Sequence, residues 1–444
     1  MFAKSLIALL STLALVTAVP NPVPPPAQQE RRGVLPTSWH HPRDHPVAAL
    51  FRRGPEDLPA VGSDAWRAKF ANLGQNPEAN IPQAWLDALH RAQAANLIPN
   101  IPLATSPDGG STAVYPPGVN GGQEPICSSQ FQCRHTDDIW DAPSGMIGLS
   151  VDDGPVSFPD ASPRLYDFLR THNQKVTHFM IGANILNAPT MFMRAFEELG
   201  DDIGVHTWTH RHMSLLSNEQ LVAELGWTLQ IIYDSTEGRV ARYWRPPYGD
   251  CDNRVRAIAK HVFGLTTVIW NQDSRDWTMA ANPPGTTLAR IQSDFANWLS
   301  GPRTPGLVIL EHEITADDVT AFINMYPLIA AASSSGQPWT AVSVAQLFDG
   351  HVEGATLNGT AVGWYQNAKD NEGDVDQEMD VAGGSPTTSS SAGHSNSTTS
   401  TRTGTATATA TSTSSHSTSD AHKTFTLGGV AVGVLVLITS ALAL

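Results

Sequence analysis

The hydrophobic pattern of the chain becomes regular from Met146 onward. Short runs rich in β-branched residues alternate there with longer amphipathic runs, which is typical of strand–helix units in a parallel sheet. The predicted strands are 146–151, 175–181, 202–206, 241–245, 265–271, 307–311 and 339–344. The predicted helices between them are 163–172, 185–199, 218–235, 253–263, 287–299 and 316–332. Seven strands separated by six helices favour an α/β fold, a distorted (β/α)7-type barrel, over an open sheet.

The preceding part of the chain is less regular. Residues 19–53 are Pro-rich and lack apolar periodicity, so we expect a disordered leader, which could be a propeptide. Residues 54–143 contain one clear helix, near 82–96, among Gly/Pro-rich connections. We expect them to form an N-terminal extension that packs on the main domain, 144–350.

Both ends of the chain carry targeting signals. Residues 1–18 combine an early lysine, an apolar run and small residues, which predicts a secretory signal peptide. An acidic polar tail, 351–384, is followed by a stalk rich in Ser and Thr, 385–421, whose composition is typical of O-glycosylation. Residues 422–444 end in an apolar tail with no basic cluster after it, which favours a glycosylphosphatidylinositol (GPI) attachment signal over a retained membrane helix. We therefore expect a secreted protein held on the outer leaflet of the plasma membrane.

Charge and cysteine content narrow the range of partners. The net charge is −15, from 27 basic and 42 acidic residues, which argues against nucleic acid as a partner because phosphate binding needs a basic face. The three cysteines, Cys127, Cys133 and Cys251, permit one disulfide in an oxidising compartment. The pair Cys127–Cys133 would close the shortest loop, but the sequence leaves the pairing open.

Polar residues that do not suit a buried core gather at the ends of the predicted strands. They are Asp152-Asp153-Gly154-Pro155, His206-Thr207-Trp208-Thr209-His210, Arg245-Pro246-Pro247-Tyr248, Asp273-Ser274-Arg275-Asp276-Trp277 and Leu310-Glu311-His312. Each group lies at the C-terminal end of a strand, which is the face of a β/α barrel where loops converge and reactions occur. Each group alone is commonly a turn or a helix face, but five together in this order predict a catalytic site.

One subset of these residues suits a metal ion. Asp153, His206 and His210 offer a carboxylate and two imidazoles, enough to hold one Zn²⁺ or a similar divalent ion with a position left open for water. The neighbouring Asp152 side chain points elsewhere, so it could act as a general base toward that water. Arg245 could hold this carboxylate ionised through a charge-assisted hydrogen bond.

Hydrolysis of an amide also needs an acid and a donor for the oxyanion. His312 is the natural acid candidate, and Asp276 could orient it and favour its protonated form. The backbone N–H of Tyr248 is the available oxyanion donor in its loop, because two prolines without N–H groups precede it. Trp277 and Leu310 could wall a pocket for an acetyl methyl group.

With these motifs, residues 146–348 resemble the NodB-homology polysaccharide deacetylases, carbohydrate esterase family 4, and the whole plan resembles that of GPI-anchored fungal chitin deacetylases. The resemblance implies a distorted (β/α) barrel and one divalent metal ion, zinc or cobalt. It also implies a role for each site residue: Asp152 as base, Asp153, His206 and His210 as ligands, His312 as acid, Arg245 as tether of the base, Asp276 as partner of the acid, and the Tyr248 amide as oxyanion donor. One departure precedes the ligands, where Ser150-Val151 stands in place of the commoner Thr-Phe.

The resemblance implies removal of N-acetyl groups from the N-acetylglucosamine units of chitin or chitooligosaccharides, at the cell wall. Two alternatives remain. An esterase that removes O-acetyl groups from a polysaccharide would use the same metal site. A catalytically inactive cell-wall protein that binds sugar would need no acid–base pair, so the presence of Asp152, Arg245, Asp276 and His312 argues against it.

Overall fold

The computed structural model describes residues 39–51, 58–70, 73–74, 76–107, 112–334 and 338–347. The predicted signal peptide, the acidic tail, the stalk and the GPI signal all lie outside these ranges. Among the residues that are described, no helix combines the length and the hydropathy needed to cross a membrane.

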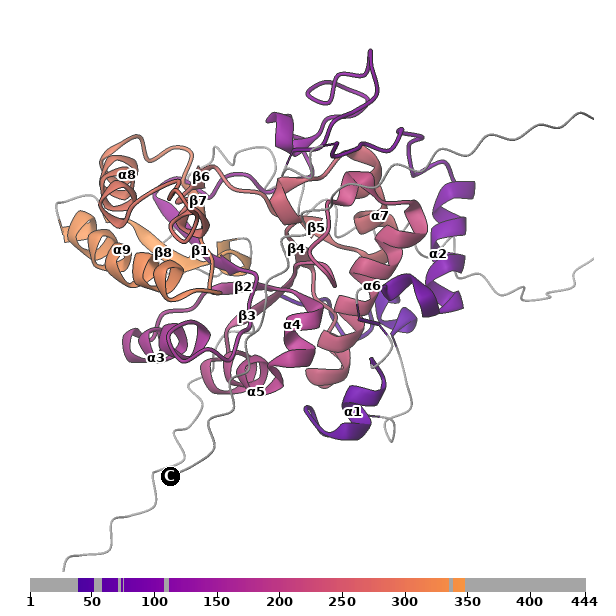
Figure 1. The fold of residues 1–444 in the computed structure, drawn as a ribbon, viewed down its shortest axis with the longest axis horizontal. Coiled ribbons are helices and arrows are strands. Elements are labelled where there is room, and N and C mark those ends of the chain that lie inside the picture. Colours follow the sequence, from indigo (N-terminus) through magenta and orange to yellow (C-terminus); the bar gives the residue numbers. More distant parts are fainter. Residues whose placement is uncertain are drawn as a thin grey trace, which may run out of the picture. The chain divides into compact units, whose positions relative to one another are not determined.

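Parallel strands form the centre of the fold (Figure 1). The first of them, β1 (Met146–Asp152), is buried along its whole length and pairs with three others. The remaining strands are β2 (Thr177–Met180), β3 (Asp202–Val205), β4 (Tyr243–Trp244), β5 (Thr266–Thr267), β6 (Gln272–Asp273), β7 (Leu307–Leu310) and β8 (Thr340–Ser343). Their order is β5-β4-β3-β2-β1-β7-β6, with β8 also pairing with β1. All predicted strands are therefore present and parallel, which confirms the predicted α/β class.

The predicted fifth strand, 265–271, is too long, because only β5 falls within it, and β6 follows directly after it at the opposite end of this order. Val268 donates its N–H to Trp244 of β4 (2.8 Å), and Asn271 donates to Val308 of β7 (3.0 Å). Between them, the N–H of Ile269 bonds to the carbonyl of Ile139 in the N-terminal extension (2.8 Å). This segment carries the chain from one edge of the sheet to the other, so the sheet curls as the predicted distorted barrel requires.

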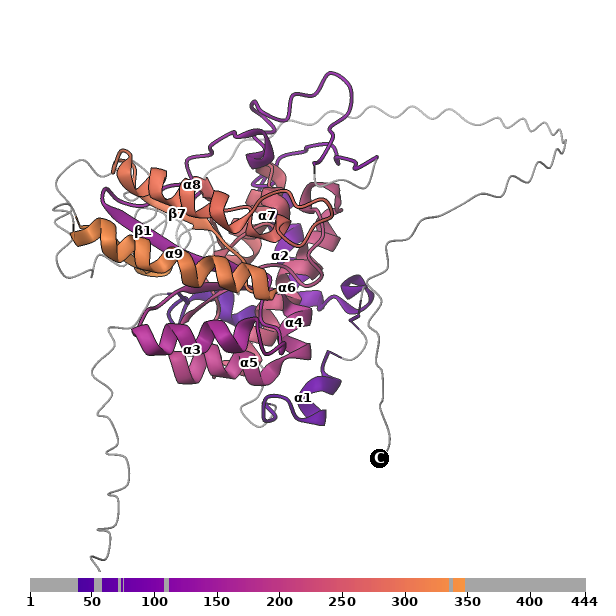
Figure 2. The ribbon, with the colours of Figure 1, turned by 60° about the vertical axis from the view of Figure 1, so that its left-hand side comes forward.

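Helices surround the sheet (Figure 2). They are α3 (Ser162–His172), α4 (Gly182–Asn187), α5 (Pro189–Met193), α6 (Asn218–Ser235), α7 (Asn253–Phe263), α8 (Leu288–Ser300) and α9 (Ala316–Ser334). A capping box begins α6, where Ser217 and Gln220 bond reciprocally. The predicted single helix 185–199 is wrong, because the chain leaves helical geometry at Ala188 and restarts at Pro189, a residue suited to a first helical turn.

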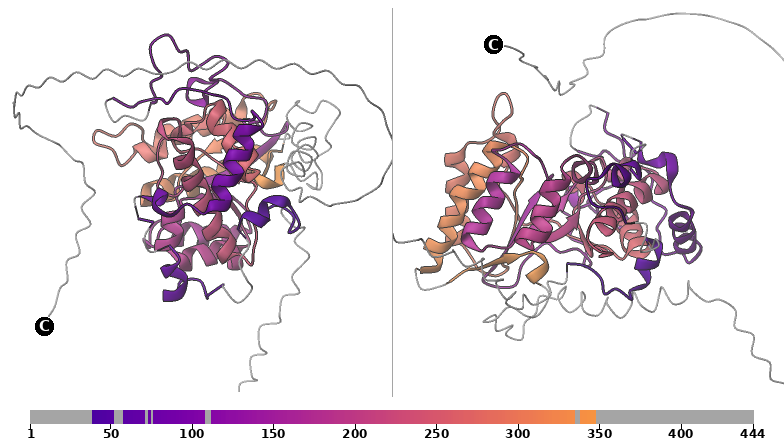
Figure 3. Two further views of the ribbon diagram at one scale, coloured as in Figure 1. Left: turned by 90° about the vertical axis from the view of Figure 1, so that its right-hand side faces the viewer. Right: turned by 90° about the horizontal axis from the view of Figure 1, so that it is seen from below.

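The N-terminal extension shares the main hydrophobic core. Its helices are α1 (Asp64–Ala68) and α2 (Gln83–Ala94), and α2 packs against α6 and α7 (Figures 1 and 3). Trp85 of α2 meets Trp227 of α6 with ring centroids 5.0 Å apart. The prediction that the extension packs on the main domain holds for the part that the structure describes.

The predicted disorder of the leader is wrong for its described part, 39–51. Trp39, Val47 and Phe51 are buried in the same core, and His40 pairs with Ala241 beside β4. The segment consists of loop and a 3₁₀ turn, Pro46–Leu50, and its few buried apolar residues form too short a run to establish a period. A composition argument therefore missed them.

Candidate active site

The paired aspartates stand at the end of the central strand. Asp152 is the last residue of β1 and only 2% exposed, and Asp153 follows it with φ +72°, a left-handed conformation that few non-glycine residues adopt. This kink in the backbone turns the two carboxylates toward different neighbours. Asp152 meets Arg245, whereas Asp153 meets two histidines.

The structure brings together the three predicted metal ligands. Oδ1 of Asp153 lies 3.1 Å from Nε2 of His206 and 3.1 Å from Nε2 of His210. One ligand atom from each of the three residues lies within 4.8 Å of the others. The loop that carries the histidines is tightly turned, with φ +65° at Thr207 and +59° at His210. The Thr207 hydroxyl accepts the N–H of His210 at 3.0 Å, which closes the turn.

These three atoms fit a cation between them. Nδ1 of His206 lies 2.7 Å from the carbonyl oxygen of Arg245, so it carries the proton and leaves a lone pair on Nε2. That lone pair faces Oδ1 of Asp153, which is buried and makes no hydrogen bond to any described residue. Two electron-rich atoms at this distance are the donor set that a divalent metal ion satisfies.

Arg245 fixes the orientation of Asp152. The guanidinium is fully buried and donates from Nη1 to Oδ1 of Asp152 at 2.7 Å. A second bond runs from Nη2 to the carbonyl of Ile269 at 3.3 Å, and the Phe179 ring lies 4.3 Å beneath. These contacts leave Oδ2 of Asp152 on the side of the candidate metal ligands, 4.0 Å from Nε2 of His206.

His312 and Asp276 form a second buried pair. Nδ1 of His312 lies 2.7 Å from Oδ1 of Asp276, and the backbone N–H of His312 donates to Oδ2 of the same carboxylate at 2.8 Å. Burial lowers the pKa of His312, but the charge and hydrogen bond of Asp276 outweigh it and raise the pKa to about 10. The ring is therefore cationic at neutral pH, with Nδ1–H engaged and Nε2–H free to donate.

The predicted substrate-side residues lie around these pairs. Tyr248 sits in the turn Pro247–Gly249 with φ +60° and is 43% exposed, and its hydroxyl lies 3.2 Å from Nδ1 of His210. Trp277 is 52% exposed in the turn Asp276–Thr278, and Leu310 is buried at the end of β7. Their contacts with an acetyl group, and the role of the Tyr248 amide, stay predictions.

Sequence reasoning missed Glu224, which lies in the middle of α6 and is fully buried. Its carboxylate accepts the backbone N–H groups of Trp208 and Thr209, both at 2.8 Å, and the Thr209 hydroxyl. Arg211 lies 3.2 Å from the same carboxylate. Glu224 thus holds the loop between the two candidate ligands, His206 and His210. The only sequence signal is an acidic residue on the apolar face of a helix.

Glu313 was also missed. It follows His312 and is fully buried, with Oε1 at 2.8 Å from Nδ1 of His178 and Oε2 accepting from Ser162 at 2.7 Å. Nε2 of His178 lies 3.1 Å from Asp201. The buried His178 is thus the centre of an ionic network next to the site.

Comparison with known proteins agrees with this geometry. Residues 141–268 match the family model described as polysaccharide deacetylase. The chain is 42% identical over 378 residues to chitin deacetylase 3 of Cryptococcus neoformans, covering 84% of this chain and 82% of that protein. It is 33% identical over 270 residues to chitin deacetylase 1 of Saccharomyces cerevisiae, covering 60% of this chain and 79% of that protein. The chain therefore belongs to the polysaccharide deacetylase family.

Proposed function

We propose that this chain is a chitin deacetylase, a hydrolase that converts N-acetylglucosamine residues of chitin to glucosamine residues, giving chitosan and acetate. The observation that carries the proposal is the convergence of Asp153, His206 and His210 beside a tethered carboxylate, Asp152, and a cationic imidazole, His312. The relatives named chitin deacetylase support the choice of substrate.

We infer that Asp153, His206 and His210 hold one divalent ion, zinc or cobalt. When bound, such an ion polarises the acetamide carbonyl and makes a water molecule more acidic. The chain's part is to hold the donors in place. His206 is fixed by its Nδ1–H bond to the Arg245 carbonyl, a contact that also sets its tautomer.

We assign the proton transfers to the two buried pairs, Asp152 with Arg245 and His312 with Asp276. Asp152, held in place by Arg245, accepts a proton from the attacking water as the water oxygen bonds to the acetamide carbon. His312 then gives its Nε2 proton to the amide nitrogen as the carbon–nitrogen bond breaks. The products are acetate and a free amine. Asp276 keeps His312 charged until that step.

The acetyl group of the substrate is proposed to bind among the residues that surround these two pairs. We propose that the Tyr248 N–H donates to the oxyanion and that Trp277 and Leu310 border the methyl group. The indole of Trp277 is 52% exposed, so a polymer substrate can reach it from the solvent.

The experiment that tests the activity is acetate release from chitin hexamer by the secreted chain, with and without a chelator. Release that the chelator abolishes and added zinc or cobalt restores supports the proposal. An O-acetylated xylan assayed in parallel separates the esterase alternative. Ester hydrolysis with no release from chitin hexamer would contradict a chitin deacetylase.

We also propose that the mature protein is secreted and held at the plasma membrane and cell wall by a GPI anchor. The supporting features are the terminal segments 1–18, 385–421 and 422–444 of the sequence. Release of the native protein from membranes by a phosphatidylinositol-specific phospholipase is expected. Retention after that treatment, with release by detergent alone, would favour a membrane helix.

A further inference from the structure

A second, smaller hydrophobic cluster lies within the N-terminal extension. It consists of Ile101, Ala104, Ala113, Tyr115 and Ile126. The cluster rests on loops of the active-site end. Ala104 donates its N–H to the carbonyl of Ser214 (3.1 Å), in the loop that follows the ligand histidines, and Leu215 packs against the cluster. The Tyr115 hydroxyl donates to Asp252 at 3.0 Å, in the loop after β4.

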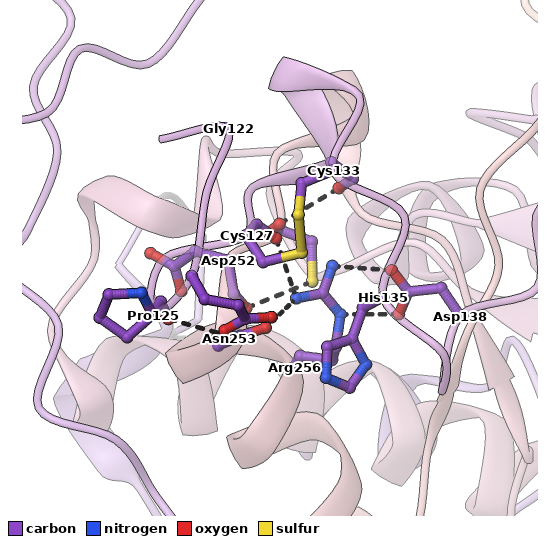
Figure 4. The surroundings of a disulfide bond; sticks show 12 residues. Gly122, Pro125, Cys127, Cys133, His135, Asp138, Asp252, Asn253 and Arg256 are labelled. Carbon is purple, nitrogen blue, oxygen red and sulfur yellow. Dashed lines mark hydrogen bonds and ion pairs between the residues drawn. A yellow bond between two sulfur atoms is a disulfide. The ribbon is translucent and has the colours of Figure 1, made fainter. Parts of the chain in front are cut away.

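A disulfide loop fixes this part of the extension (Figure 4). Cys127 and Cys133 are bonded, while Cys251 is a free, buried thiol. Arg256 of α7 donates two bonds of 2.7 Å to Asp138 and one of 3.2 Å to the Cys127 carbonyl. Arg256 of the main domain therefore holds the chain at Cys127, where the disulfide loop begins, and at Asp138, shortly after it ends.

Residues inside the disulfide loop reach the Tyr248 turn. The Ser129 hydroxyl donates to the Gly249 carbonyl at 2.7 Å. The Gln130 amide donates to the Tyr248 carbonyl at 3.3 Å and accepts the N–H of Ala113 at 2.9 Å. Gln130 thus joins three segments of the chain next to a residue that contacts the ligand His210.

Exposed apolar side chains flank Gln130. Phe131 follows it and is 43% exposed, with one side of its ring against Gly121 and Tyr115. Val114 follows Ala113 and is 47% exposed. With Tyr248, they are half of the large apolar side chains that are exposed among the described residues. Apolar side chains that stay exposed beside a candidate site favour a binding surface there.

We propose that Phe131 and Val114 extend the binding surface of Tyr248, and that a chitin chain lies across it beyond the unit that is deacetylated. This inference rests on the proposed function and deepens it. The apolar face of a pyranose ring suits an exposed aromatic ring, and a neutral polymer needs no basic groups. We assign the surface to the chitin chain because it is continuous with the active site through Tyr248 and Gln130. A polymer substrate must extend past the unit that reacts.

The test compares chitin hexamer with chitin dimer in the full chain and in three variants, Phe131→Tyr, Phe131→Leu and Phe131→Ala. The measured quantity is the ratio of kcat/KM on hexamer to kcat/KM on dimer, so that changes in folding or metal content cancel. A stacking role predicts a ratio that falls about fivefold in the Leu and Ala variants and stays within about twofold in the Tyr variant.

Two results would overturn the inference while leaving the proposed function intact. One is an unchanged ratio in Phe131→Ala. The other is a Leu variant as good as the Tyr variant, since that would assign Phe131 to packing on Gly121 and Tyr115. A parent chain that releases no acetate from either oligomer contradicts the proposed function instead. In that case the affinity of each variant for chitin hexamer tests the surface directly. We expect Phe131→Tyr to bind hexamer about as tightly as the parent chain, and Phe131→Leu and Phe131→Ala to bind it more weakly.

Discussion

Asp152 and His312 occupy paired positions on neighbouring parallel strand ends. The N–H of Asp152 donates to the Glu311 carbonyl at 2.9 Å, and the N–H of Glu313 donates to the Asp152 carbonyl at 3.2 Å. Backbone bonds therefore set the spacing of the proposed base and acid, instead of mobile loops. Two groups held in this way can serve opposite sides of one small substrate group without a conformational change.

The pairing of His312 with Asp276 predicts a shift in the pH profile. The acid must be protonated to act, so activity falls as pH rises through its pKa, which Asp276 helps to raise to about 10. In Asp276→Asn the alkaline limb of kcat/KM should move to lower pH by roughly one unit or more, since one neighbouring charge is lost. The matched control is Asp317→Asn, which removes an exposed carboxylate of α9. A limb that stays in place in Asp276→Asn would contradict the role of His312 as acid.

Replacing Glu224 should weaken metal binding, although none of the three proposed ligands is changed. Replacement by Gln removes the charge that holds the N–H groups of Trp208 and Thr209. We expect the dissociation constant for zinc, measured by calorimetry on the metal-free chain, to rise about tenfold. Glu219→Gln is the matched control, because Glu219 is exposed at the start of the same helix. Equal affinities in the two variants would leave Glu224 with a purely structural role.

The network behind the site predicts a pH-dependent stability. Burial lowers the pKa of His178, but Glu313 and Asp201 outweigh it and raise the pKa to about 10. The unfolded value is about 6.5, so the stabilisation is complete below about pH 6.5 and is lost as pH rises toward 10. His178→Gln should lower the free energy of unfolding by about 3–5 kcal/mol at about pH 6, since it removes the cation that lies between two buried carboxylates.

Urea unfolding of the parent chain and His178→Gln at about pH 6 and about pH 9 checks this sign. The difference between the two proteins should be smaller at the higher pH. The control is His90→Gln, which replaces an exposed histidine of α2 and should show no such trend. A difference that is constant or grows with pH would contradict a cationic His178.

The site was largely predictable because its signals are local. Each motif joins a strand to the polar residues that immediately follow it, so the strand period and the residue types sufficed to bring Asp153, His206 and His210 together. Partners from distant segments were not predictable. Glu224 lies 15 residues from Thr209, and Gln130 lies 118 residues from Tyr248, so nothing in the local pattern connects them.

The errors in the fold have the same origin. Pro189 begins a new helix because a proline is tolerated in a first turn, yet the apolar period continues across it and predicted one helix. The predicted strand 265–271 ends after β5, because Ile269 bonds to Ile139 of the extension, a contact that no periodicity reveals. The buried residues of 39–51 lie in irregular structure, where composition alone suggested disorder.

The central claim is that Asp152 acts on protons while Asp153, His206 and His210 hold the metal ion. It is tested most directly by measuring bound metal and acetate release from chitin hexamer in the same preparation of Asp152→Asn, with His206→Ala beside it. We predict that Asp152→Asn retains about one equivalent of zinc and loses at least about a hundredfold in kcat, whereas His206→Ala loses the metal as well. Parental activity in Asp152→Asn with metal bound would contradict the account.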